Sequence, residues 1–546
     1  MSHNEAPAEN DHVVIDEDAP GPPISVPDSG DTGEGGKLKM IVQLVKKCLG
    51  VKDIATMRLS LPASLLEPVP NLEYWQYLDR PDLFAAVNDA EFPFERMLSV
   101  VRFAFTKDLK FVHGKVCKPY NSVLGEHFRA HWDVPPVAYD DAQTVIPLTH
   151  TTTTSDSAVN ISDSASIKSG RSSKSTRSGF SAFSKAKAST PATSPPQSVE
   201  ANVAAQMSNL SLGNDPDSER LRVVYVTEQV SHHPPVSTYY ASCPKRNLEM
   251  FGIDQISAKV SGTTVKVSPG QFNQGIFINL TGGFGEGERY HITHPVASVN
   301  GILRGSFYVT VSESTIITCT GGKPGTKFRA IIEYKEESWL GRAHFLIEGV
   351  IHTVHEGEDD HEEWTKVKHV PADRVVAVFD GSWRGHIRWR RVGAGSYPNA
   401  FSSSASSPSP SHEHLATPDV PKHAASRTDV SRLDTEYSML IDLSALQIIP
   451  KEVRPLEKQL PHESRKLWKN VTDNLMKKEY SEATREKVTI EQRQRDEAAE
   501  RKRKGTEFIP KYFEKDLSTG YAKLTEEGWK AVKEELEESI PTCVEA

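Results

Sequence analysis

A succession of short apolar segments between residues 219 and 392 constrains the fold of this chain more than any other feature. The segments are rich in β-branched and aromatic residues and are separated by Gly, Asn, Pro and charged residues, which is typical of strands and turns. Eight strands are predicted, at 222–226, 236–241, 258–267, 276–280, 306–319, 328–334, 345–354 and 374–379. Because no helical pattern lies between them, the sheet must be antiparallel, and a sheet of that many strands is expected to curl or close around a cavity.

Helical patterns flank the strands on both sides. Residues 78–87 and 94–105 precede the strands, and two long helices, at about 463–478 and 482–504, follow them. The predicted fold class is therefore α+β: a large, antiparallel, near-closed β-barrel with an N-terminal lid helix and C-terminal helices.

Three segments have the composition of disordered chain, with many Ser, Thr, Pro and Asp residues and few large apolar ones. They are the N-terminus, 1–36, and two insertions, 149–218 and 395–431. We expect a single domain over 37–515 that contains both insertions. A C-terminal tail, 516–546, follows it, and helix formation in this tail is left open.

Charge and cysteine content exclude several classes of protein. The formal net charge is −9, so the chain lacks the basic footprint of a nucleic-acid-binding protein. The five cysteines are scattered, which fits reduced thiols better than a disulfide framework. No apolar run has the length needed to span a bilayer, and residues 1–36 lack the apolar core of a signal peptide. We therefore expect a cytoplasmic protein.

Two adjacent histidines, His232 and His233, follow an apolar strand and precede two prolines. The prolines restrict the backbone around them, so the imidazoles are expected on a stiff corner at the end of a strand. Such a corner can hold two ring donors ready for a phosphate. The alternative is an ordinary pair of loop histidines with no function.

Two further patterns contain groups that bind phosphate. In the stretch 118–126 (KPYNSVLGE), Lys118 can act as a point charge and Asn121 can donate from its amide, while Gly125 permits a close turn. In the last long helix, Lys487, Glu491 and Arg495 recur every four residues and form one stripe. The alternatives are a surface lysine for Lys118 and a solvated ladder of ion pairs for the stripe.

The octapeptide 228–235 (EQVSHHPP), together with 118–126, resembles the signatures of the oxysterol-binding protein-related family of lipid transfer proteins, in a short, fungal-like form. The resemblance implies a lipid tunnel inside the barrel and a phosphoinositide headgroup site at its rim, in which His232 and His233 take the 4-phosphate. The implied headgroup-binding residues are Lys118, Asn121, Glu126, His232, His233, Lys487, Glu491 and Arg495.

Residues 37–49 form a basic amphipathic helix, with apolar residues on one face and lysines opposite. We interpret this helix as a lid over the tunnel that can also contact anionic membranes; an ordinary packed N-terminal helix is the alternative. The segment 59–68 resembles the family's connection from lid to body. The implied lid and tunnel residues are Leu38, Ile41, Val42, Val45, Leu61, Leu65 and Leu66.

The family resemblance implies exchange of phosphatidylinositol 4-phosphate for a second lipid between membranes, on the endoplasmic reticulum and at contact sites. The sequence of 292–341 resembles the phosphatidylserine-carrying branch of the family. The sequence of 61–65 (LPASL) differs from the bulkier aromatic run expected in that branch, so sterol is kept as an alternative second cargo. The competing hypothesis is a lipid-dependent sensor or scaffold that does not transfer lipid catalytically. No zinc-binding motif and no esterase nucleophile motif occur, so we expect no metal, no cofactor and no catalytic residues.

Overall fold

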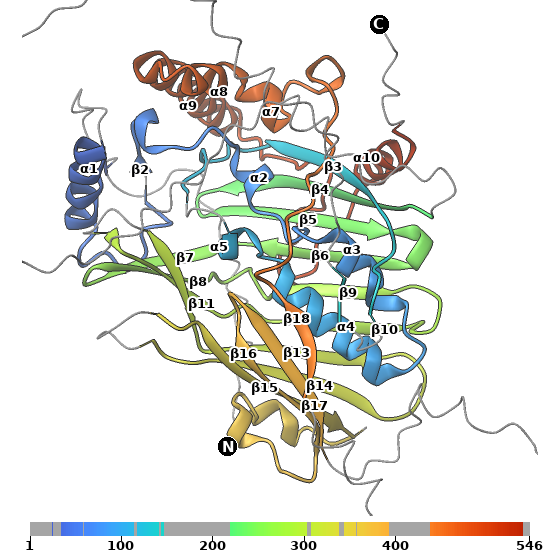
Figure 1. Ribbon diagram of the computed structural model, residues 1–546. Coiled ribbons are helices and arrows are strands. Elements are labelled where there is room, and N and C mark those ends of the chain that lie inside the picture. The colour runs from blue at the N-terminus through green and yellow to red at the C-terminus, as the bar shows by residue number, and fades with distance from the viewer. Residues whose placement is uncertain are drawn as a thin grey trace, which may run out of the picture. The chain divides into compact units, whose positions relative to one another are not determined.

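The computed structural model describes residues 24–25, 34–57, 59–113, 117–140, 144–146, 219–302, 307–337, 343–355, 357–392 and 437–538. The described elements belong to one compact unit, formed by 1–148 and 217–546 (Figure 1). The predicted insertions, 149–218 and 395–431, lie outside the described residues, as does nearly all of the predicted N-terminal segment 1–36.

Antiparallel strands dominate the described part of the chain, as the sequence predicts. Twelve strands form one sheet, in the order β18-β17-β16-β15-β14-β13-β10-β9-β6-β5-β4-β3. Their bounds are β3 His127–Val134, β4 Leu221–His232, β5 Pro235–Cys243, β6 Leu248–Asp254, β9 Ile276–Leu280, β10 Glu288–Ile292, β13 Ser314–Gly321, β14 Lys327–Tyr334, β15 Leu346–Val354, β16 Val375–Ser382, β17 His386–Arg391 and β18 Ser438–Asp442.

A smaller sheet has four antiparallel strands in the order β12-β11-β8-β7. They are β7 Ile256–Ser261, β8 Thr264–Pro269, β11 Val296–Asn300 and β12 Tyr308–Ser312. The predicted strand 258–267 is wrong as one strand, because Gly262 has a φ of +59° and turns the chain back between β7 and β8. The predicted strand 306–319 also divides, at Glu313, whose φ is +68°. The last described pair is a short parallel one, β1 (Ile24–Ser25) with β2 (Leu59–Ser60).

The large sheet is not closed, so the predicted near-closed barrel is not confirmed. Its two ends are β18 and β3, and they do not pair with each other in the described part of the chain. Instead, the chain that follows β18 reaches the free side of β3. His131 and Glu452 exchange backbone hydrogen bonds of 3.0 and 2.8 Å, and the Trp132 indole donates to the Ile449 carbonyl at 3.1 Å. This connection protects the β3 edge without a further strand.

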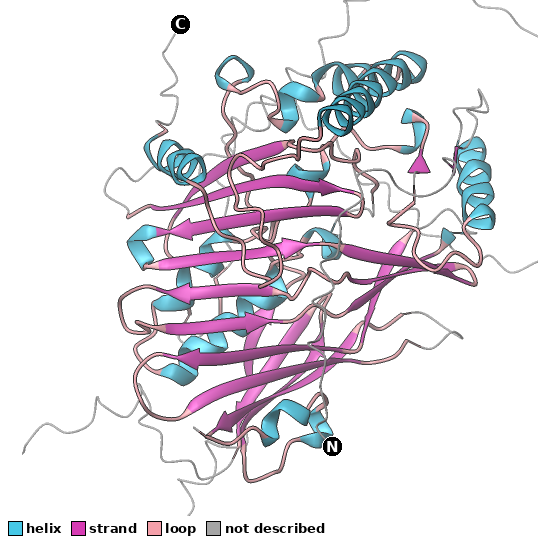
Figure 2. Cartoon of the chain, turned by 180° about the vertical axis from the view of Figure 1, so that it is seen from behind, coloured by secondary structure: helices cyan, strands magenta, loops and turns pink. Residues whose placement is uncertain are grey.

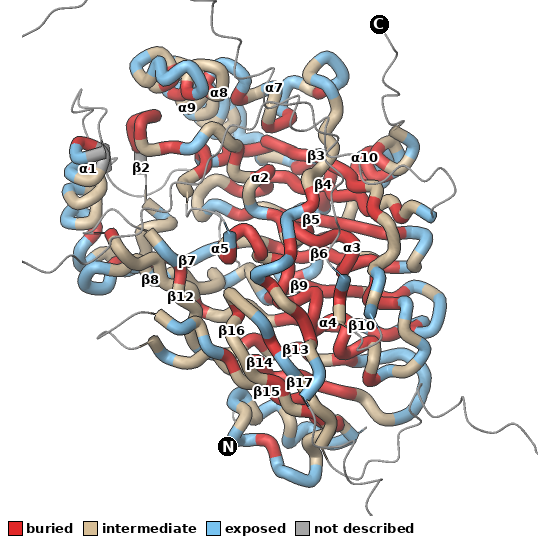
Figure 3. The backbone as a smooth tube through the Cα atoms, in the orientation of Figure 1, coloured by how far each residue is buried: buried red, intermediate tan, exposed pale blue. Residues whose placement is uncertain are grey.

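Four helices between β2 and β3 cover one face of the large sheet (Figures 1 and 2). They are α2 Asn71–Tyr74, α3 Pro81–Ala85, α4 Pro93–Thr106 and α5 Lys110–His113. Proline occupies the first helical position of α3 and α4, where its missing N–H costs nothing. The rings of Phe94 and Phe105 on α4 contact Phe328 and Phe379 on the sheet. The main apolar core lies here, as the buried stretches in Figure 3 show.

The C-terminal part of the chain packs against β4 from the other side. On β4, Val223 and Tyr225 belong to the main core, whereas Val224 and Val226 pack with Tyr512, Phe513, Ala531 and Val532. This alternation is the two-residue period of a strand buried on both faces. The residues assigned to a tail in the sequence analysis therefore include a helix, α10 (Glu526–Glu537), that covers the sheet.

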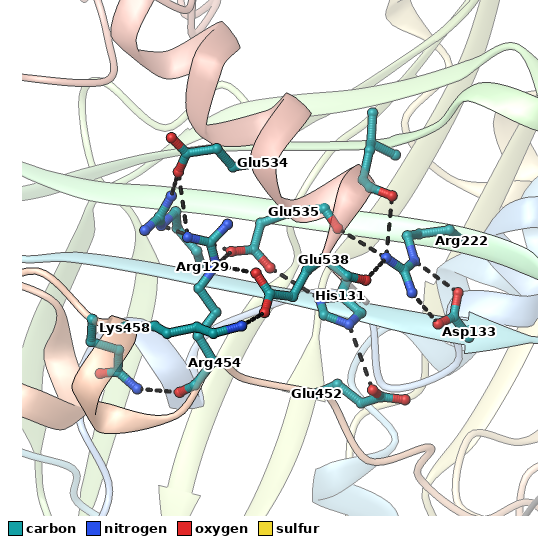
Figure 4. A network of polar contacts seen from close by, with 12 residues as sticks. Arg129, His131, Asp133, Arg222, Glu452, Arg454, Lys458, Glu534, Glu535 and Glu538 are labelled. Atoms are coloured by element: carbon teal, nitrogen blue, oxygen red, sulfur yellow. Dashed lines mark hydrogen bonds and ion pairs between the residues drawn. The ribbon is translucent and has the colours of Figure 1, made fainter. Parts of the chain in front are cut away.

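A network of charged residues fixes α10 to the sheet (Figure 4). Glu535 is fully buried and lies 2.6 Å from Arg454 and 3.0 Å from His131. Arg222 donates to the Glu535 and Leu536 carbonyls at 3.3 and 3.2 Å. A cation at this position satisfies the last carbonyls of the helix and favours its dipole.

The predicted helix 463–478 is divided in the structure. It forms α7 (Ser464–Leu467) and α8 (Lys469–Met476), with a break at Trp468, whose backbone (φ −94°, ψ 7°) leaves the helical region. The predicted helix 482–504 is confirmed as α9 (Tyr480–Lys504). Gly505, with a φ of +61°, ends it in the left-handed conformation common after helices. None of the described helices is long and apolar enough to cross a membrane.

Candidate functional site

The two histidines lie at the corner between β4 and β5. His232 ends β4 and pairs with Pro235, the first residue of β5, across a turn that contains a cis bond between His233 and Pro234. The two imidazole rings are half-buried, with centroids 4.4 Å apart and planes inclined by 67°. The predicted corner at a strand end is therefore present.

The segment 118–126, which we call the lysine loop, immediately precedes β3. The Lys118 ammonium donates to the Pro119 carbonyl at 2.9 Å and to Asn121 Oδ1 at 2.7 Å, and Asn121 itself is exposed. The Lys118 carbonyl accepts from the backbone N–H of Glu67 at 3.0 Å, which connects this loop to the segment that follows the lid. Asn121 thus orients the lysine through its oxygen and keeps its amide N–H groups for another partner.

Lys487 on α9 is buried, with an exposed fraction of 3%, and its ammonium lies 2.6 Å from Glu491 Oε1. Burial lowers the pKa of Lys118, and the positive charge of Lys487 lowers it further, to about 8. The two lysines are therefore electrostatic neighbours, although one lies before the sheet in the sequence and the other after it. A half-buried ammonium that feels a second positive charge favours a nearby anion.

Backbone hydrogen bonds connect the lysine loop to the histidine strand. The Gly125 N–H donates to the Gln229 carbonyl at 2.9 Å, and the Gln229 N–H donates to the Glu126 carbonyl at 2.8 Å. Gly125 has a φ of +77°, and a Cβ atom there would lie 3.2 Å from the Phe508 ring. The close turn predicted at Gly125 is confirmed, and it brings the two motifs together at one end of β3 and β4.

Glu126 lies inside the protein rather than on its surface. Its carboxylate accepts from the Ser464 hydroxyl at 2.7 Å, the Trp468 indole at 2.9 Å and the Val123 N–H at 3.0 Å. Burial raises its pKa to about 7. Both carboxylate oxygens already accept hydrogen bonds from other residues of the protein. Direct contact between Glu126 and a headgroup therefore stays a prediction, and this geometry does not favour it.

Of the three residues predicted to form a stripe on α9, Lys487 and Glu491 contact each other, but Arg495 contacts neither. Glu491 binds Lys487, whereas Arg495 is exposed and donates to Gln492 Oε1 at 3.1 Å on the same helix. Arg495 as a headgroup ligand stays a prediction.

The helix predicted at 37–49, whose role as a lid stays a prediction, is α1 (Glu34–Lys47). The predicted apolar residues Leu38, Ile41, Val42 and Val45 are only half-buried. Met40 on α1 and Cys48 just after it are buried, and Leu44 packs against the apolar cluster that includes Leu61, Leu66, Tyr120 and Trp468. Leu61 and Leu66 are buried and Leu65 is half-buried, so the predicted segment after the lid belongs to this cluster.

Two residues that sequence reasoning left without a role are central to the site. Glu228, the first residue of the histidine motif, is fully buried and accepts from the Lys511 and Tyr512 N–H groups, both at 2.7 Å. Trp468 donates to Glu126 and packs on Tyr120 with ring centroids 4.9 Å apart. An acidic residue inside an apolar strand is the signal that could have marked Glu228, since a buried carboxylate needs partners.

The part of the chain that the structure describes contains one group of three potential metal ligands, His131, Asp133 and Glu452, whose ligand atoms lie within 4.8 Å of one another. Asp133 already binds Arg222, and His131 binds Glu535. A cation would have to displace a guanidinium, so we assign this group to the docking of α10.

Comparison with known proteins gives one family. A family model described as oxysterol-binding protein matches residues 40–175 and 211–539. The chain is 35% identical over 538 residues to oxysterol-binding protein-like protein 1 of Schizosaccharomyces pombe, and the match covers 92% of each chain. It is 28% identical over 461 residues to human oxysterol-binding protein-related protein 11, of which the chain spans 46%.

Among solved structures, the chain is similar to the Osh1 ORD domain, determined in complex with ergosterol. The TM-score is 0.50 and the sequence identity is 19%, over 90% of this chain and 88% of the other. At that identity the likeness concerns the fold.

Proposed function

The chain belongs to the oxysterol-binding protein family, and from this premise we propose that it is a lipid transfer protein. It takes phosphatidylinositol 4-phosphate from one membrane and exchanges it for a second lipid, a sterol or phosphatidylserine, from another. It acts in the cytoplasm as a peripheral membrane protein and has no enzymatic role.

Two observations carry this proposal: the positive charge of Lys487 acts on Lys118, and backbone hydrogen bonds connect the Lys118 loop to the strand that ends in the histidine corner. A phosphate monoester has an overall charge of about −1.5 to −2 at neutral pH and three strong acceptor oxygens. Two ammonium groups supply charge, and two imidazoles supply directed N–H donors, so the four residues complement that group. Glu491 holds the Lys487 ammonium and is available to accept from a ring hydroxyl.

The packing of α1 supports its role as a lid. A helix that covers lipid tails must present apolar side chains that its own packing has not consumed. Leu38, Ile41, Val42 and Val45 meet this condition because they are only half-buried. On the same helix, Lys39 and Lys46 are exposed and can approach anionic headgroups.

The energetics of such a carrier allow reversible exchange. Apolar surface gains about 25 cal/mol per Å² when it leaves water. The tails of a membrane lipid are already out of water, so their move from bilayer to protein is nearly neutral. The headgroup site then supplies the difference that gives exchange a direction when phosphatidylinositol 4-phosphate is richer in one membrane.

A transfer assay between liposomes tests this function. The donor vesicles contain phosphatidylinositol 4-phosphate, the acceptor vesicles contain either sterol or phosphatidylserine, and the protein is substoichiometric to both lipids. We expect several lipids moved per protein molecule, with one of the two second cargoes accelerating the exchange. A sensor or scaffold would bind vesicles but would stop after a single turnover.

A further inference from the structure

Two buried glutamates lie where the chain enters β3 and where β4 runs beside it. Glu228 pairs with His127, the residue that follows Glu126, and Gln229 donates to the Glu126 carbonyl at 2.8 Å. Both side chains are fully buried, with exposed fractions of 0%. Buried carboxylates are costly unless donors surround them, so the donors show what each carboxylate holds.

Glu126 holds the chain that leads into the α8–α9 pair. Its oxygens accept from Ser464 on α7 and from Trp468, the residue immediately before α8, at 2.7 and 2.9 Å. Trp468 is itself buried, and its ring packs on Tyr120 in the lysine loop. The start of α8 is therefore bound to the loop that carries Lys118.

Glu228 holds the chain that leaves the α8–α9 pair. Its two oxygens accept from two consecutive backbone N–H groups, those of Lys511 and Tyr512. The Tyr512 ring also packs on His127, with centroids 4.8 Å apart. The segment after α9 is thus fixed to the strand that ends, four residues later, in His232.

Glu126 immediately precedes β3, and Glu228 lies on the adjacent strand β4. All of α8 and α9 lies, in sequence, between the two segments that these carboxylates bind, at 464–468 and at 511–512. Lys487 is on α9, so its position relative to Lys118 and the histidines depends on how the pair is held at both ends. The carboxylates connect the helical pair to the two motifs that contain the other phosphate ligands.

We infer that Glu126 and Glu228 are positioning residues, which fix the α8–α9 pair at both ends so that Lys487 reaches the same phosphate as Lys118, His232 and His233. This inference rests on the proposed function. It assigns Glu126 a role different from the direct headgroup contact expected from the sequence, and it gives a role to the first residue of the histidine motif. Burial raises the pKa of both carboxyls to about 7, which agrees with their enclosure.

The test uses Glu228→Gln and Glu126→Gln in the full chain. A glutamine keeps one acceptor oxygen but turns an NH₂ group toward the second donor, so each variant loosens one anchor with almost no change in volume. Glu288→Gln is the matched control, because Glu288 is a buried carboxylate on β10 that binds Arg96 rather than α7 or the chain after α9. Thermal melting reports the stability lost by each variant.

The first readout is affinity for vesicles that contain phosphatidylinositol 4-phosphate. We expect each anchor variant to weaken binding about tenfold, the size of one lost charge-assisted hydrogen bond. The control should stay within about twofold of the wild type even if it melts at the same temperature as the anchor variants. Either anchor variant is sufficient, so failure of one to fold leaves the other.

The second readout is a double-mutant cycle with Lys487→Ala. If Glu228 acts through Lys487, then Glu228→Gln should cost less than about twofold once Lys487 is absent. The positioning role would be overturned if the effects of Glu228→Gln and Lys487→Ala on affinity were fully additive, or if both anchor variants bound with wild-type affinity. Neither result would affect the proposed function. A wild-type protein that does not distinguish these vesicles from vesicles without the lipid would overturn the proposed function, and the positioning role with it.

Discussion

Lys118, in the loop before β3, and Lys487, on α9, share one electrostatic environment. Burial lowers the pKa of Lys118, and the charge of Lys487 lowers it further, to about 8. Like charges that act on each other lower the pKa of an ammonium group, and a bound anion counteracts that shift. The predictions below begin with this pair.

Binding of the phosphorylated headgroup should weaken as the pH rises through about 8. Lys118 is charged below its pKa and neutral above it, and a bound phosphate favours the charged form. The phosphate is already dianionic above about pH 7, so its own titration does not produce the trend. Isothermal titration calorimetry at about pH 7 and about pH 9 should show weaker binding of the headgroup at the higher pH. The complex should also take up more protons on binding at that pH, because Lys118 becomes charged when the phosphate binds. Lys118→Arg, whose guanidinium stays charged, should abolish both differences; a pH dependence unchanged in this variant would contradict the assignment.

Loss of the lid should release lipid without unfolding the protein. We predict that removal of residues 1–49 abolishes lipid retention, because α1 packs on the body mainly through Met40, Leu44 and Cys48. A point variant makes the same test: Leu44→Asp places a charge against the cluster of Leu61 and Trp468, whereas Gln43→Asp changes an exposed position on the same helix. Retention of labelled lipid on gel filtration should fall for Leu44→Asp and not for Gln43→Asp. Equal retention in both variants would remove the lid assignment.

Deletion of the first insertion should leave lipid transfer intact. The strands on either side of 149–218 are neighbours, with Val134 paired to Leu221, so a short Gly/Ser linker can replace the segment. Shorter connections cost slightly less closure entropy, about 0.6 kcal/mol for each halving of length. The melting temperature should therefore stay the same or rise slightly. A protein that no longer melts cooperatively would show that this segment is needed for the fold.

The fold and the site were predictable to the extent that they depend on local pattern. The β-branched and aromatic runs located eight strand segments but missed β3, β6, β10, β17 and β18 of the large sheet, and helix 482–504 was located to within two residues of its observed start. The helix break at Trp468 was not predictable, because it depends on a tertiary hydrogen bond from the indole to Glu126. The covering of the sheet by α10 was missed for a similar reason: its charged residues suggest a solvated tail until Arg129, Arg454 and His131 are placed beside them.

The docking of α10 should weaken at alkaline pH. Burial alone would lower the pKa of His131, but the carboxylates of Glu452 and Glu535 outweigh it and raise the pKa to about 9. A pKa raised above the unfolded value of about 6.5 means that this stabilisation is complete below about pH 6.5 and is lost as the pH rises through about 9. Urea unfolding should therefore lose a pH-dependent contribution of the order of 1 to 3 kcal/mol over that range. His131→Gln should lose most of this pH dependence; the same slope in the variant would assign it to other groups.

The most direct test of the account is extraction of phosphatidylinositol 4-phosphate from liposomes by a protein in which His232 and His233 are both replaced by alanine. Each charge-assisted bond that is lost costs about 1.5 to 3 kcal/mol, so we predict extraction weakened roughly a hundredfold or more. The second cargo, which lacks the 4-phosphate monoester, should still be extracted, and this distinguishes a lost site from a lost fold. Wild-type extraction of phosphatidylinositol 4-phosphate by the double variant would contradict the headgroup site and the transfer mechanism built on it.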